Sequence, residues 1–259
     1  MIGYENMKIV SHREIAANIF ELNLEGELTK KMTSAGQFVH LKITSGNDPL
    51  LRRPISICSI DAEMNQFTML YRVSGNGTRV LSERAPGAFI HVLGPLGNGF
   101  PDDYLKEGEQ ALLIGGGIGV PPLYELSKRL VKNGVQVTHI LGFQTESAVF
   151  YKNEFEELGE THIATADGTH GVKGFVTDVA EQLSIQPDAY YTCGPSPMLK
   201  AVESKYETIN GFISMEQRMG CGIGACLACV CHVAGDESRL EYKKVCSDGP
   251  VFKSGEVVI

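Results

Sequence analysis

Four cysteines in the last forty residues constrain this chain more than any other feature of its sequence. Three of them lie in the stretch MGCGIGACLACVCH and are spaced Cys221-x4-Cys226-x2-Cys229, and Cys246 follows after sixteen intervening residues. The spacing C-x4-C-x2-C with a distant fourth cysteine is the plant-type pattern for a [2Fe–2S] cluster. We therefore predict that these four cysteines are metal ligands, with two thiolates for each iron.

Small residues separate the cysteines, and a cluster-binding loop needs them. Gly220, Gly222 and Gly224 permit the positive φ values with which a backbone curls around a cluster. Ala225 and Ala228 let the backbone approach closely. Backbone N–H groups can then point at the sulfurs and tune the potential.

Structural zinc is the alternative metal. Zinc sites usually pair two C-x2–4-C knuckles, or one knuckle with a pair of histidines. Here Cys246 has no knuckle partner, and His232 stands alone beside Cys231. The spacing therefore favours iron and sulfide. Cys231 is a spare thiol, and we expect it to be buried like Cys58 and Cys193, because a free cysteine usually packs as a small apolar side chain.

Charge and hydropathy exclude several classes of partner and location. The 259 residues carry a formal net charge of -8 and no basic run, so neither nucleic acid nor an anionic membrane surface is an expected partner. No apolar run approaches the roughly 18 residues of a membrane helix, and no signal-peptide pattern is present. We expect a cytoplasmic protein. Clustered cysteines in that reducing compartment are more often metal ligands than disulfides, and seven is an odd number.

The pattern of strand-like, helix-like and turn residues changes twice along the sequence, which predicts a multi-domain protein. Residues 1–103 are short β-like runs separated by turn residues, typical of a small antiparallel β-barrel. Residues 104–215 alternate strand and helix, which indicates an α/β, Rossmann-like domain with helices on both faces of a parallel sheet. Residues 216–259 contain the cysteine cluster and form a third, small domain.

The expected elements follow from these patterns. In the barrel we predict strands at 38–43, 55–60, 66–73 and 89–93 and a short helix near 78–83. In the α/β part we predict strands at 111–114, 135–141, 161–166, 189–192 and 211–215, and helices at 123–132, 149–158, 176–183 and 197–206.

A glycine-rich loop, GGGIGVPP, follows a predicted strand and opens a predicted helix. In that context backbone amides often meet a pyrophosphate, and the candidate cofactor-binding residues are Gly115, Gly116, Gly117 and Gly119. The loop departs from G-x-G-x-x-G at Pro121, and no acidic residue ends a strand about 20 positions on. A tight strand-to-helix turn would look the same, so both interpretations stay open for this loop alone.

A second loop, CGPSPM, lies between another predicted strand and helix at the same edge of the sheet. Ligands of such sheets bind beyond the carboxyl ends of the strands, so the second loop supports a nucleotide site. The stretch GFQTESAVF after the second strand has no arginine and carries Glu146, which favours NAD over NADP. Lys152 is a nearby cation that counts against this preference.

The barrel half contains two informative pieces, RRPISI and LYRVSGNGTRVLS. Arg53 is a planar cation suited to a diphosphate, and Ser56 adds a hydroxyl. Tyr71 could stack on a flat ring, and the free N–H groups near Gly77 and Thr78 suit a phosphate. Each feature also fits an ordinary strand entry, hairpin or core residue. Taken singly, none of them therefore indicates a cofactor site.

The order RPIS, YRVSGNGT, GGGIGVPP, CGPSPM and then the cysteine cluster resembles the ferredoxin–NADP reductase superfamily over essentially the whole chain. Within it, the chain is similar to the electron-transfer subunits of class 1B dihydroorotate dehydrogenase, a family of pyrimidine synthesis. The resemblance implies FAD and one [2Fe–2S] cluster in this chain, with NAD as substrate. It also implies an FMN-containing catalytic partner subunit that oxidises dihydroorotate, in a heterotetramer of two subunits of each kind.

The resemblance also assigns residues, and it assigns no catalytic acid, base or nucleophile. The cluster ligands it implies are the four cysteines named above, and the nicotinamide-side motif falls on Cys193, Gly194 and Pro195. One departure is Pro54-Ile55, where relatives often have an aromatic residue before the serine. The FAD motif falls on Arg53, Pro54, Ile55, Ser56, Leu70, Tyr71, Arg72, Gly77 and Thr78.

Two other functions remain open from the sequence. The chain could be the small flavin and iron–sulfur subunit of a ferredoxin:NAD(P) oxidoreductase or of a hydrogenase. It could also be a zinc-stabilised nucleotide-binding module without a redox role. The electron-transfer function implied by the resemblance is chemically consistent, because a flavin can connect one-electron carriers with a two-electron acceptor such as NAD.

Overall fold

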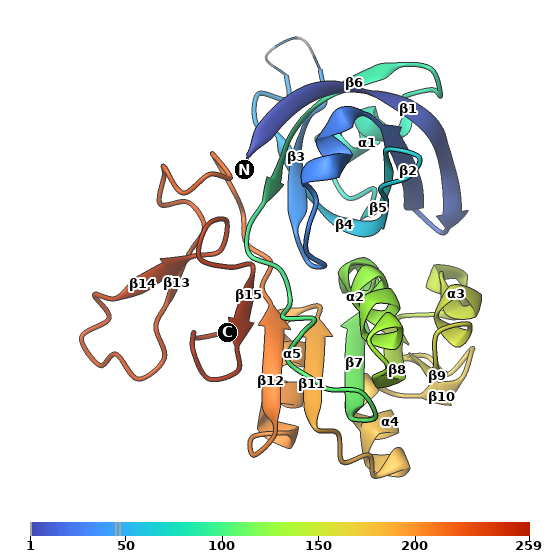
Figure 1. Ribbon diagram of the computed structural model, residues 1–259, viewed down its shortest axis with the longest axis vertical. Helices are drawn as coiled ribbons and strands as arrows, with labels where there is room; N and C mark the ends of the chain where they lie inside the picture. Colours follow the sequence, from blue (N-terminus) through green and yellow to red (C-terminus); the bar gives the residue numbers. More distant parts are fainter. Residues whose placement is uncertain (1, 45, 47) are drawn as a thin grey trace.

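The computed structural model describes residues 2–44, 46 and 48–259. These residues form a barrel, an α/β domain beneath it and a small cysteine-bearing segment at one side (Figure 1). None of the helices in the described ranges has the length and apolar character needed to cross a membrane.

The barrel is closed by six antiparallel strands in the order β1-β2-β5-β4-β3-β6. Its 3-10 helix η1 (Glu27–Lys31) follows β2, and helix α1 (Asn76–Ser82) follows β5. The predicted β-barrel is therefore confirmed, and the helix predicted near 78–83 begins two residues earlier. The strands are β1 (Gly3–Ala16), β2 (Ile19–Glu25), β3 (Phe38–Lys42), β4 (Arg53–Asp61), β5 (Gln66–Arg72) and β6 (Phe89–Leu96).

The period-two alternation of each strand decides what fills the barrel and what faces outward. Alternate residues along each strand point into the barrel and are buried there, for example Val39 and Leu41 of β3. Phe38 and His40 must therefore project from the outer face of β3. Both are nevertheless buried, with 3% and 0% of their surface exposed, because other parts of the chain cover that face.

The α/β domain is built on a seven-stranded sheet in the order β10-β9-β8-β7-β11-β12-β15. Strands β7 to β12 run parallel, as predicted, but β15 pairs antiparallel with β12. The sequence did not indicate β15, because three residues after the cysteine cluster carry no recognisable period. The strands are β7 (Gln110–Gly116), β8 (Gln136–Phe143), β9 (Glu160–Thr165), β10 (Val172–Lys173), β11 (Ala189–Cys193), β12 (Asn210–Ser214) and β15 (Val251–Lys253).

Helices cover both faces of this sheet. Helix α2 (Pro121–Lys132) and the short α3 (Lys152–Glu156) contribute to one apolar core, while α4 (Val176–Leu183) and α5 (Ser196–Lys205) contribute to the other. Two further 3-10 turns, η2 (Gly117–Gly119) and η3 (Glu146–Ala148), follow β7 and β8. The predicted helix at 149–158 is shorter than expected because Val149 is extended and Tyr151 adopts a left-handed conformation, with φ of 59°.

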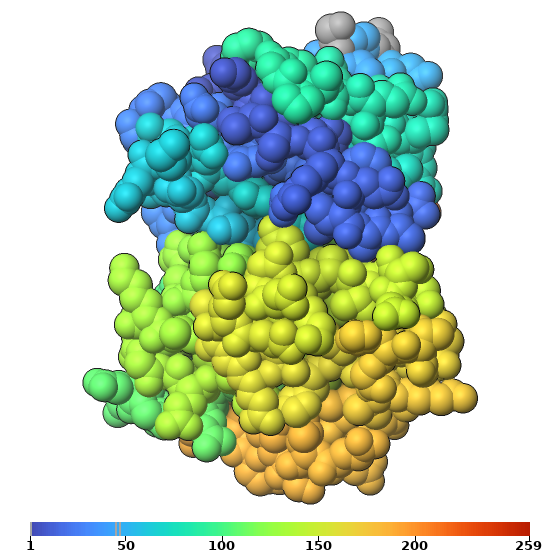
Figure 2. All heavy atoms as spheres, turned by 90° about the vertical axis from the view of Figure 1, so that its right-hand side faces the viewer, coloured from blue at the N-terminus to red at the C-terminus, as the bar shows by residue number. Residues whose placement is uncertain are grey.

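Polar contacts fix the barrel against the α/β domain. From α2, the Glu125 carboxylate accepts a hydrogen bond from the Ile60 amide at 3.1 Å, and Lys128 donates to Ser59 Oγ at 2.9 Å. From the start of α3, the Tyr151 hydroxyl donates to Glu21 Oε2 at 2.7 Å. The two lobes pack directly on one another (Figure 2), and the arrows of β7, β11 and β12 point toward the barrel, so the carboxyl edge of the sheet faces it (Figure 1).

The cysteine segment is joined to both larger parts. It contains a two-stranded sheet of β13 (Val230–His232) and β14 (Tyr242–Lys244), and it then returns to the large sheet through β15. At the end of β6, the Asn98 amide donates to Gly249 O at 2.7 Å, and Asn98 Nδ2 donates to Ser247 O at 3.0 Å. The segment is thereby held between barrel and sheet. The domain boundaries at 103/104 and 215/216 stay predictions.

Candidate functional site

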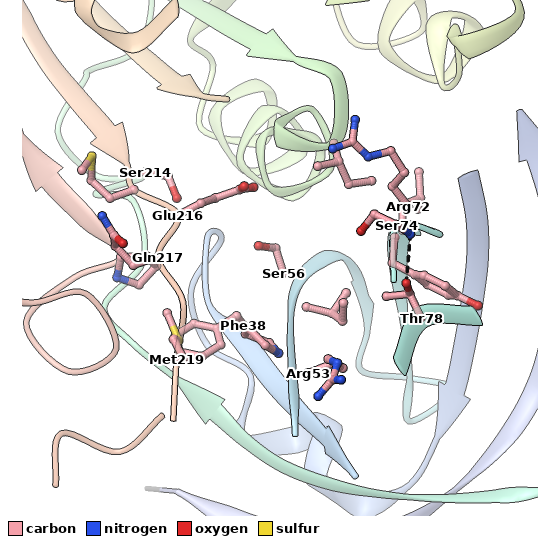
Figure 3. A pocket seen from close by; sticks show the side chains of 17 residues that line it. Phe38, Arg53, Ser56, Arg72, Ser74, Thr78, Ser214, Glu216, Gln217 and Met219 are labelled. Atoms are coloured by element: carbon pink, nitrogen blue, oxygen red, sulfur yellow. Dashed lines mark hydrogen bonds between the residues drawn. The ribbon is translucent and has the colours of Figure 1, made fainter. Parts of the chain in front are cut away.

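A cavity of about 290 Å³ opens where the three parts of the chain meet (Figure 3). Its barrel wall comes from β4, β5 and the turn into α1. Eight of the nine residues predicted to bind FAD line this wall, namely Arg53, Pro54, Ile55, Ser56, Leu70, Tyr71, Arg72 and Thr78. The structure thus gathers two separate sequence motifs at one concave surface. That these residues contact FAD stays a prediction.

The ninth residue, Gly77, supports the wall from behind. A Cβ atom at Gly77 would lie 2.6 Å from Cζ of Arg53, so only glycine leaves space for the guanidinium there. Arg53 also donates to Leu51 O. The guanidinium is therefore placed by the backbone and by the missing side chain of Gly77, with its charge beside the cavity.

The turn that precedes α1 uses two of its amides internally, while the suitability of the N–H groups at Gly77 and Thr78 for a phosphate stays a prediction. The Thr78 hydroxyl accepts hydrogen bonds from the amides of Ser74 at 3.0 Å and Gly75 at 3.2 Å. These two N–H groups are therefore occupied within the turn and are not free for a phosphate. Thr78 therefore stabilises the turn through its hydroxyl and also lines the cavity.

Tyr71 borders the cavity from a well-supported position. Its hydroxyl lies 2.8 Å from His12 Nε2, and its ring stacks on Phe20 with centroids 5.7 Å apart. Burial raises the pKa of the phenol, so Tyr71 stays protonated. The stack on Phe20 fixes the plane of the Tyr71 ring, which is what packing against a flat ligand ring requires.

The opposite wall was not found by sequence reasoning. It consists of residues at and after the carboxyl end of β12, and it includes Ile118 of the glycine loop and Pro250 before β15. Burial raises the pKa of the Glu216 carboxyl, although the cation Arg72 opposes the shift. The sequence offered one clue to these residues: they join the last predicted strand to the cysteines. Its cavity-lining residues are Ser214, Met215, Glu216, Gln217 and Met219.

The two nucleotide-type loops touch one another at the carboxyl edge of the sheet. Strands β7 and β11 are neighbours, with Cys193 opposite Gly115. A Cβ atom at Gly119 would lie 2.6 Å from the carbonyl carbon of Cys193, and one at Gly116 would lie 2.5 Å from Met198 Sδ. These glycines allow the loops to pack closely, and Ile118 between them reaches the cavity. The edge at which the two loops meet therefore adjoins the cavity through Ile118.

Residues that follow β8 support the preference for NAD. Glu146 begins η3 at this same edge, and its carboxylate lies 3.6 Å from His170 Nδ1. Lys152, which counted against NAD in the sequence, forms an ion pair with Glu156 at 2.5 Å. The cation is thereby engaged along its own helix, while the Glu146 carboxylate remains at the carboxyl end of β8.

The four predicted cluster cysteines come together as two pairs. The amide of Cys226 donates to Cys221 Sγ at 3.3 Å, and the amide of Gly224 donates to Cys246 Sγ at 3.2 Å. Burial opposes ionisation of Cys221, but hydrogen bonds from neighbouring backbone amides outweigh it and lower its pKa to about 6. Burial raises the pKa of Cys246 to about 11, and the adjacent Cys229 thiol adds to the rise.

This donor set fits an iron–sulfur cluster. Two pairs of thiols match two irons, and amides already point at two of the sulfurs, which is how a protein tunes such a cluster. Within the part of the chain that the structure describes, no three His, Cys, Asp or Glu side chains are arranged to hold a single metal ion. That the four cysteines are the ligands stays a prediction.

The glycines of the loop divide into two kinds. Gly222 and Gly224 have φ of 71° and 80°, as predicted. The prediction is wrong for Gly220, which has no positive φ; a Cβ atom there would lie 3.3 Å from Cys226 Sγ. Gly220 thus lies close to the Cys226 sulfur, and its backbone is outside the left-handed region.

The remaining cysteines are buried, as expected. Cys58 and Cys193 are 0% and 1% exposed, and burial raises the pKa of both thiols. Cys231 is also buried, with its sulfur 3.5 Å from Lys243 O in the small sheet. These three thiols are packing residues in this structure.

Replacement of Gly222 by alanine is expected to lower the cluster content of the purified protein. A Cβ atom at Gly222 would lie 2.6 Å from His40 Cε1, and its φ of 71° is costly for alanine. The matched control is Gly235→Ala, where φ is 81° and no atom lies within 4 Å of the new Cβ. The control carries the left-handed strain alone, about 1–2 kcal/mol.

Iron and acid-labile sulfide per chain are the quantities to measure. We expect Gly222→Ala to lose most of its iron, while Gly235→Ala keeps nearly all of it. Equal iron content in the two variants would show that contact with His40 does not matter for the loop.

Family models match three successive parts of the chain. They are an oxidoreductase FAD-binding domain over residues 6–100, an oxidoreductase NAD-binding domain over residues 113–204, and the iron–sulfur cluster binding domain of dihydroorotate dehydrogenase B over residues 216–258. These matches confirm the predicted fold class and the predicted cofactors FAD, NAD and an iron–sulfur cluster.

Full-length relatives agree with the domain matches. Proteins from Bacillus mycoides and Bacillus anthracis are each 59% identical to this chain over 259 residues, which covers 100% of both sequences in each comparison. Both are named dihydroorotate dehydrogenase B (NAD(+)), electron transfer subunit.

Solved structures share the same architecture. A chain of an NADH-dependent reduced ferredoxin-NADP oxidoreductase superposes with a TM-score of 0.85 at 30% identity, covering 99% of this chain and 91% of its own. The ferredoxin reductase of a carbazole 1,9a-dioxygenase superposes with a TM-score of 0.66 at 19% identity, covering 79% and 65%, which shows the fold alone.

Proposed function

We propose a function for this chain from one premise: it belongs to the family of dihydroorotate dehydrogenase B (NAD(+)) electron transfer subunits. It is thus an oxidoreductase subunit with FAD-binding, NAD-binding and iron–sulfur domains. In our proposal it receives electrons that a catalytic partner removes from dihydroorotate and delivers them to NAD+. FAD can take electrons singly or in pairs, so it supplies the link between a one-electron cluster and hydride transfer to NAD+.

One observation carries this proposal: the cavity lies between the cysteine segment and the edge where the glycine loop meets Cys193. Met219 lines the cavity two residues before Cys221, and Ile118 lines it from the loop that touches Cys193. A flavin ring held in the cavity would adjoin both neighbours, and no long-range step is then needed.

The side chains of the cavity have distinct tasks in this proposal. Arg53 and Arg72 supply positive charge for a diphosphate, for which planar guanidinium groups are well suited. Tyr71, fixed by Phe20 and His12, packs against a flat ring. The apolar Leu70 wall excludes water from the ring. The chain thus binds and orients, and no acid, base or nucleophile among the described residues is assigned to chemistry.

The cysteines would hold a [2Fe–2S] cluster in the order that their pairing indicates. Cys221 and Cys226 would serve one iron, and Cys229 and Cys246 the other. The amides on Cys221 and Cys246 favour the thiolate forms that ligation needs. Free thiols in such number persist in a reducing compartment, so we also infer a cytoplasmic location.

We infer that the partner is an FMN-containing catalytic subunit, assembled with this chain as two of each. Relatives are named electron transfer subunits, and such a subunit needs a source of electrons. Two apolar side chains beside the cluster cysteines, Ile223 and Leu227, are 48% and 59% exposed. Exposed apolar residues at this position suit a docking surface through which electrons reach the cluster.

The test is anaerobic purification of the chain from its native cell with whatever binds to it. We expect iron, acid-labile sulfide and FAD on this chain, and an associated subunit that carries FMN. A chain that holds neither iron nor flavin would refute the proposal. A large partner with iron–sulfur clusters in place of FMN would instead support a ferredoxin:NAD(P) oxidoreductase, as the 0.85 TM-score to such an enzyme makes worth testing.

Preference for NAD gives a further expected result. Replacement of Glu146 by arginine should raise the ratio of kcat/KM for NADPH to that for NADH by about tenfold, because it replaces a like charge with a phosphate ligand. Steady-state dye reduction with each nucleotide measures the ratio. The control is Glu181→Arg in α4, which makes the same charge change at an exposed residue of another element. An unchanged ratio in Glu146→Arg would place the nucleotide ribose elsewhere.

A further inference from the structure

His40 is a buried histidine without a hydrogen-bonding role in the described protein. It lies in β3 with 0% of its surface exposed, and both ring nitrogens lack a hydrogen-bond partner among the described residues. A buried polar group without a partner costs free energy, and buried side-chain nitrogens are generally bonded. The other fully buried histidine, His139, has both ring nitrogens bonded. His40 therefore calls for a partner that the polypeptide itself does not supply.

The ring of His40 lies against the cluster loop. A Cβ atom at Gly222 would be 2.6 Å from Cε1, 2.8 Å from Nε2 and 2.9 Å from Nδ1 of His40. Gly222 directly follows Cys221 and precedes Gly224, whose amide points at the Cys246 sulfur. The unpartnered nitrogens are thus next to the loop that carries the sulfurs, with no side chain between ring and backbone.

The remaining neighbours of His40 offer no competing acceptor. Its strand partners are Pro54 and Leu93, of which neither side chain can bond a ring nitrogen. Phe38, two residues earlier on the same face, packs against the ring with centroids 5.7 Å apart. Arg52 is a cation that donates to His40 O at 3.3 Å, so it can accept nothing from the imidazole.

The ring is neutral at physiological pH. Burial lowers the pKa of His40 to about 4, and the nearby Arg52 charge adds to the effect. A neutral imidazole carries one N–H donor and one acceptor nitrogen. Sulfurs of an iron–sulfur centre are acceptors, and donors directed at them are among the main means by which proteins set the potential.

We propose that His40 donates its ring N–H to a sulfur of the iron–sulfur centre, and so raises the reduction potential of the cluster and seats its loop on the barrel. Reduction adds negative charge to the centre, and a hydrogen bond donated to sulfur stabilises that charge. His40 is a positioning residue in this role. The inference rests on the proposed ligation of a cluster by the four cysteines.

Strand β3 then has a second consequence for the electron route. Phe38 lines the flavin cavity, and His40, two residues on, faces the cluster loop. One rigid strand of the barrel would therefore set the position of both cofactors relative to each other.

The experiment uses the intact chain loaded with its cofactors and labelled with 15N-histidine. Pulsed electron paramagnetic resonance of the reduced cluster should detect a weak 15N coupling. The coupling should vanish in His40→Leu, which removes the donor at similar size, and in His40→Gln, whose amide is unlabelled. His232, which lies in β13 of the cysteine segment, keeps its label in both variants, so any signal that persists in them is assigned to it and only the lost signal to His40.

A potential titration separates a hydrogen bond from packing. The one-electron reduction constant of the cluster should fall about tenfold in His40→Leu, which is about 59 mV for one electron. His40→Gln retains an N–H donor, so it should recover at least half of this loss. His162→Leu, in β9 of the α/β domain, should leave the potential unchanged.

The outcomes are distinguishable. Loss of the coupling together with the fall in potential supports the inference. A loaded wild-type protein without histidine coupling overturns it, even if His40→Leu fails to fold or to take up iron. Equal potentials in wild type and His40→Leu also overturn it, and leave the proposed function intact. A wild-type chain without any cluster would refute both.

Discussion

Replacement of Cys226 by serine is expected to abolish the reduction of NAD+ that depends on the catalytic partner, while NADH-driven reduction of a dye largely persists. Cys226 forms a pair with Cys221, and its own amide donates to the Cys221 sulfur. Loss of one thiolate removes one of the two protein ligands proposed for one iron. Because changes to groups that merely support metal ligands cost about 10–100-fold, loss of a ligand should lower partner-dependent transfer by more than about 100-fold.

The two activities should separate because they use different parts of the chain. In the proposed route, dye reduction needs NADH beside Gly119 and Cys193 and a flavin in the cavity, and none of the four cluster cysteines lines the cavity. Transfer from the partner needs the cluster as well. We therefore expect at least half of the dye activity in Cys226→Ser, with iron content near zero.

Cys231→Ser is the matched control, since it makes the same atomic change five residues away. Cys231 is buried with its sulfur near Lys243 O, where a serine hydroxyl can also donate. This variant should keep its iron and both activities. If Cys226→Ser transfers electrons from the partner at the wild-type rate, the cluster does not lie on the route and the proposed mechanism is wrong.

Local sequence patterns were sufficient for the three-part organisation of the chain and for the two barrel motifs of the cavity, but they did not indicate β1 and β2 of the barrel. Each of these signals is local: a spacing, a period of two or a glycine between strand and helix. The strands and helices of the α/β domain lie within a few residues of their predicted ranges, with α4 at 176–183 as predicted. Periodicity works here because buried strands and amphipathic helices impose it directly on the sequence.

The far wall of the cavity could not be predicted, and the reason is physical. Ser214 to Met219 become functional candidates only because β12 ends opposite the barrel, which depends on how two domains pack. His40 is a similar case. In FVHLK it is an outward position of a strand, and the sequence contains no sign that Gly222, more than 180 residues later, covers it.

Strand β15 shows the same limit at the level of topology. Its three residues pair with β12 only because Asn98 and Gly249 bring the cysteine segment back beside the sheet. A strand so short is defined by its partner and not by its own composition. Features that depend on contacts between distant segments therefore cannot be predicted from local patterns in the sequence.

Substitution of Gly77 by alanine is expected to give the second large effect, a loss of FAD from an otherwise folded protein. The new Cβ would lie 2.6 Å from Cζ and Nη2 of Arg53. The guanidinium is the far end of a flexible side chain, so it can move aside at small cost to folding. Its displacement removes a cation from the cavity wall, and hydrogen bonds to charged groups contribute about 1.5–3 kcal/mol. FAD should bind about 10- to 100-fold more weakly.

Gly75→Ala, two residues earlier in the same turn, isolates this cause. Gly75 is extended, with φ of -165°, and a Cβ atom there meets nothing within 4 Å. Flavin content per chain after gel filtration and FAD affinity by fluorescence titration compare the two variants. We expect Gly75→Ala to match wild type and Gly77→Ala to resemble Arg53→Ala. Full flavin content in both Gly77→Ala and Arg53→Ala would mean that the diphosphate is held by other groups. In that case the cavity would bind its cofactor in a different orientation.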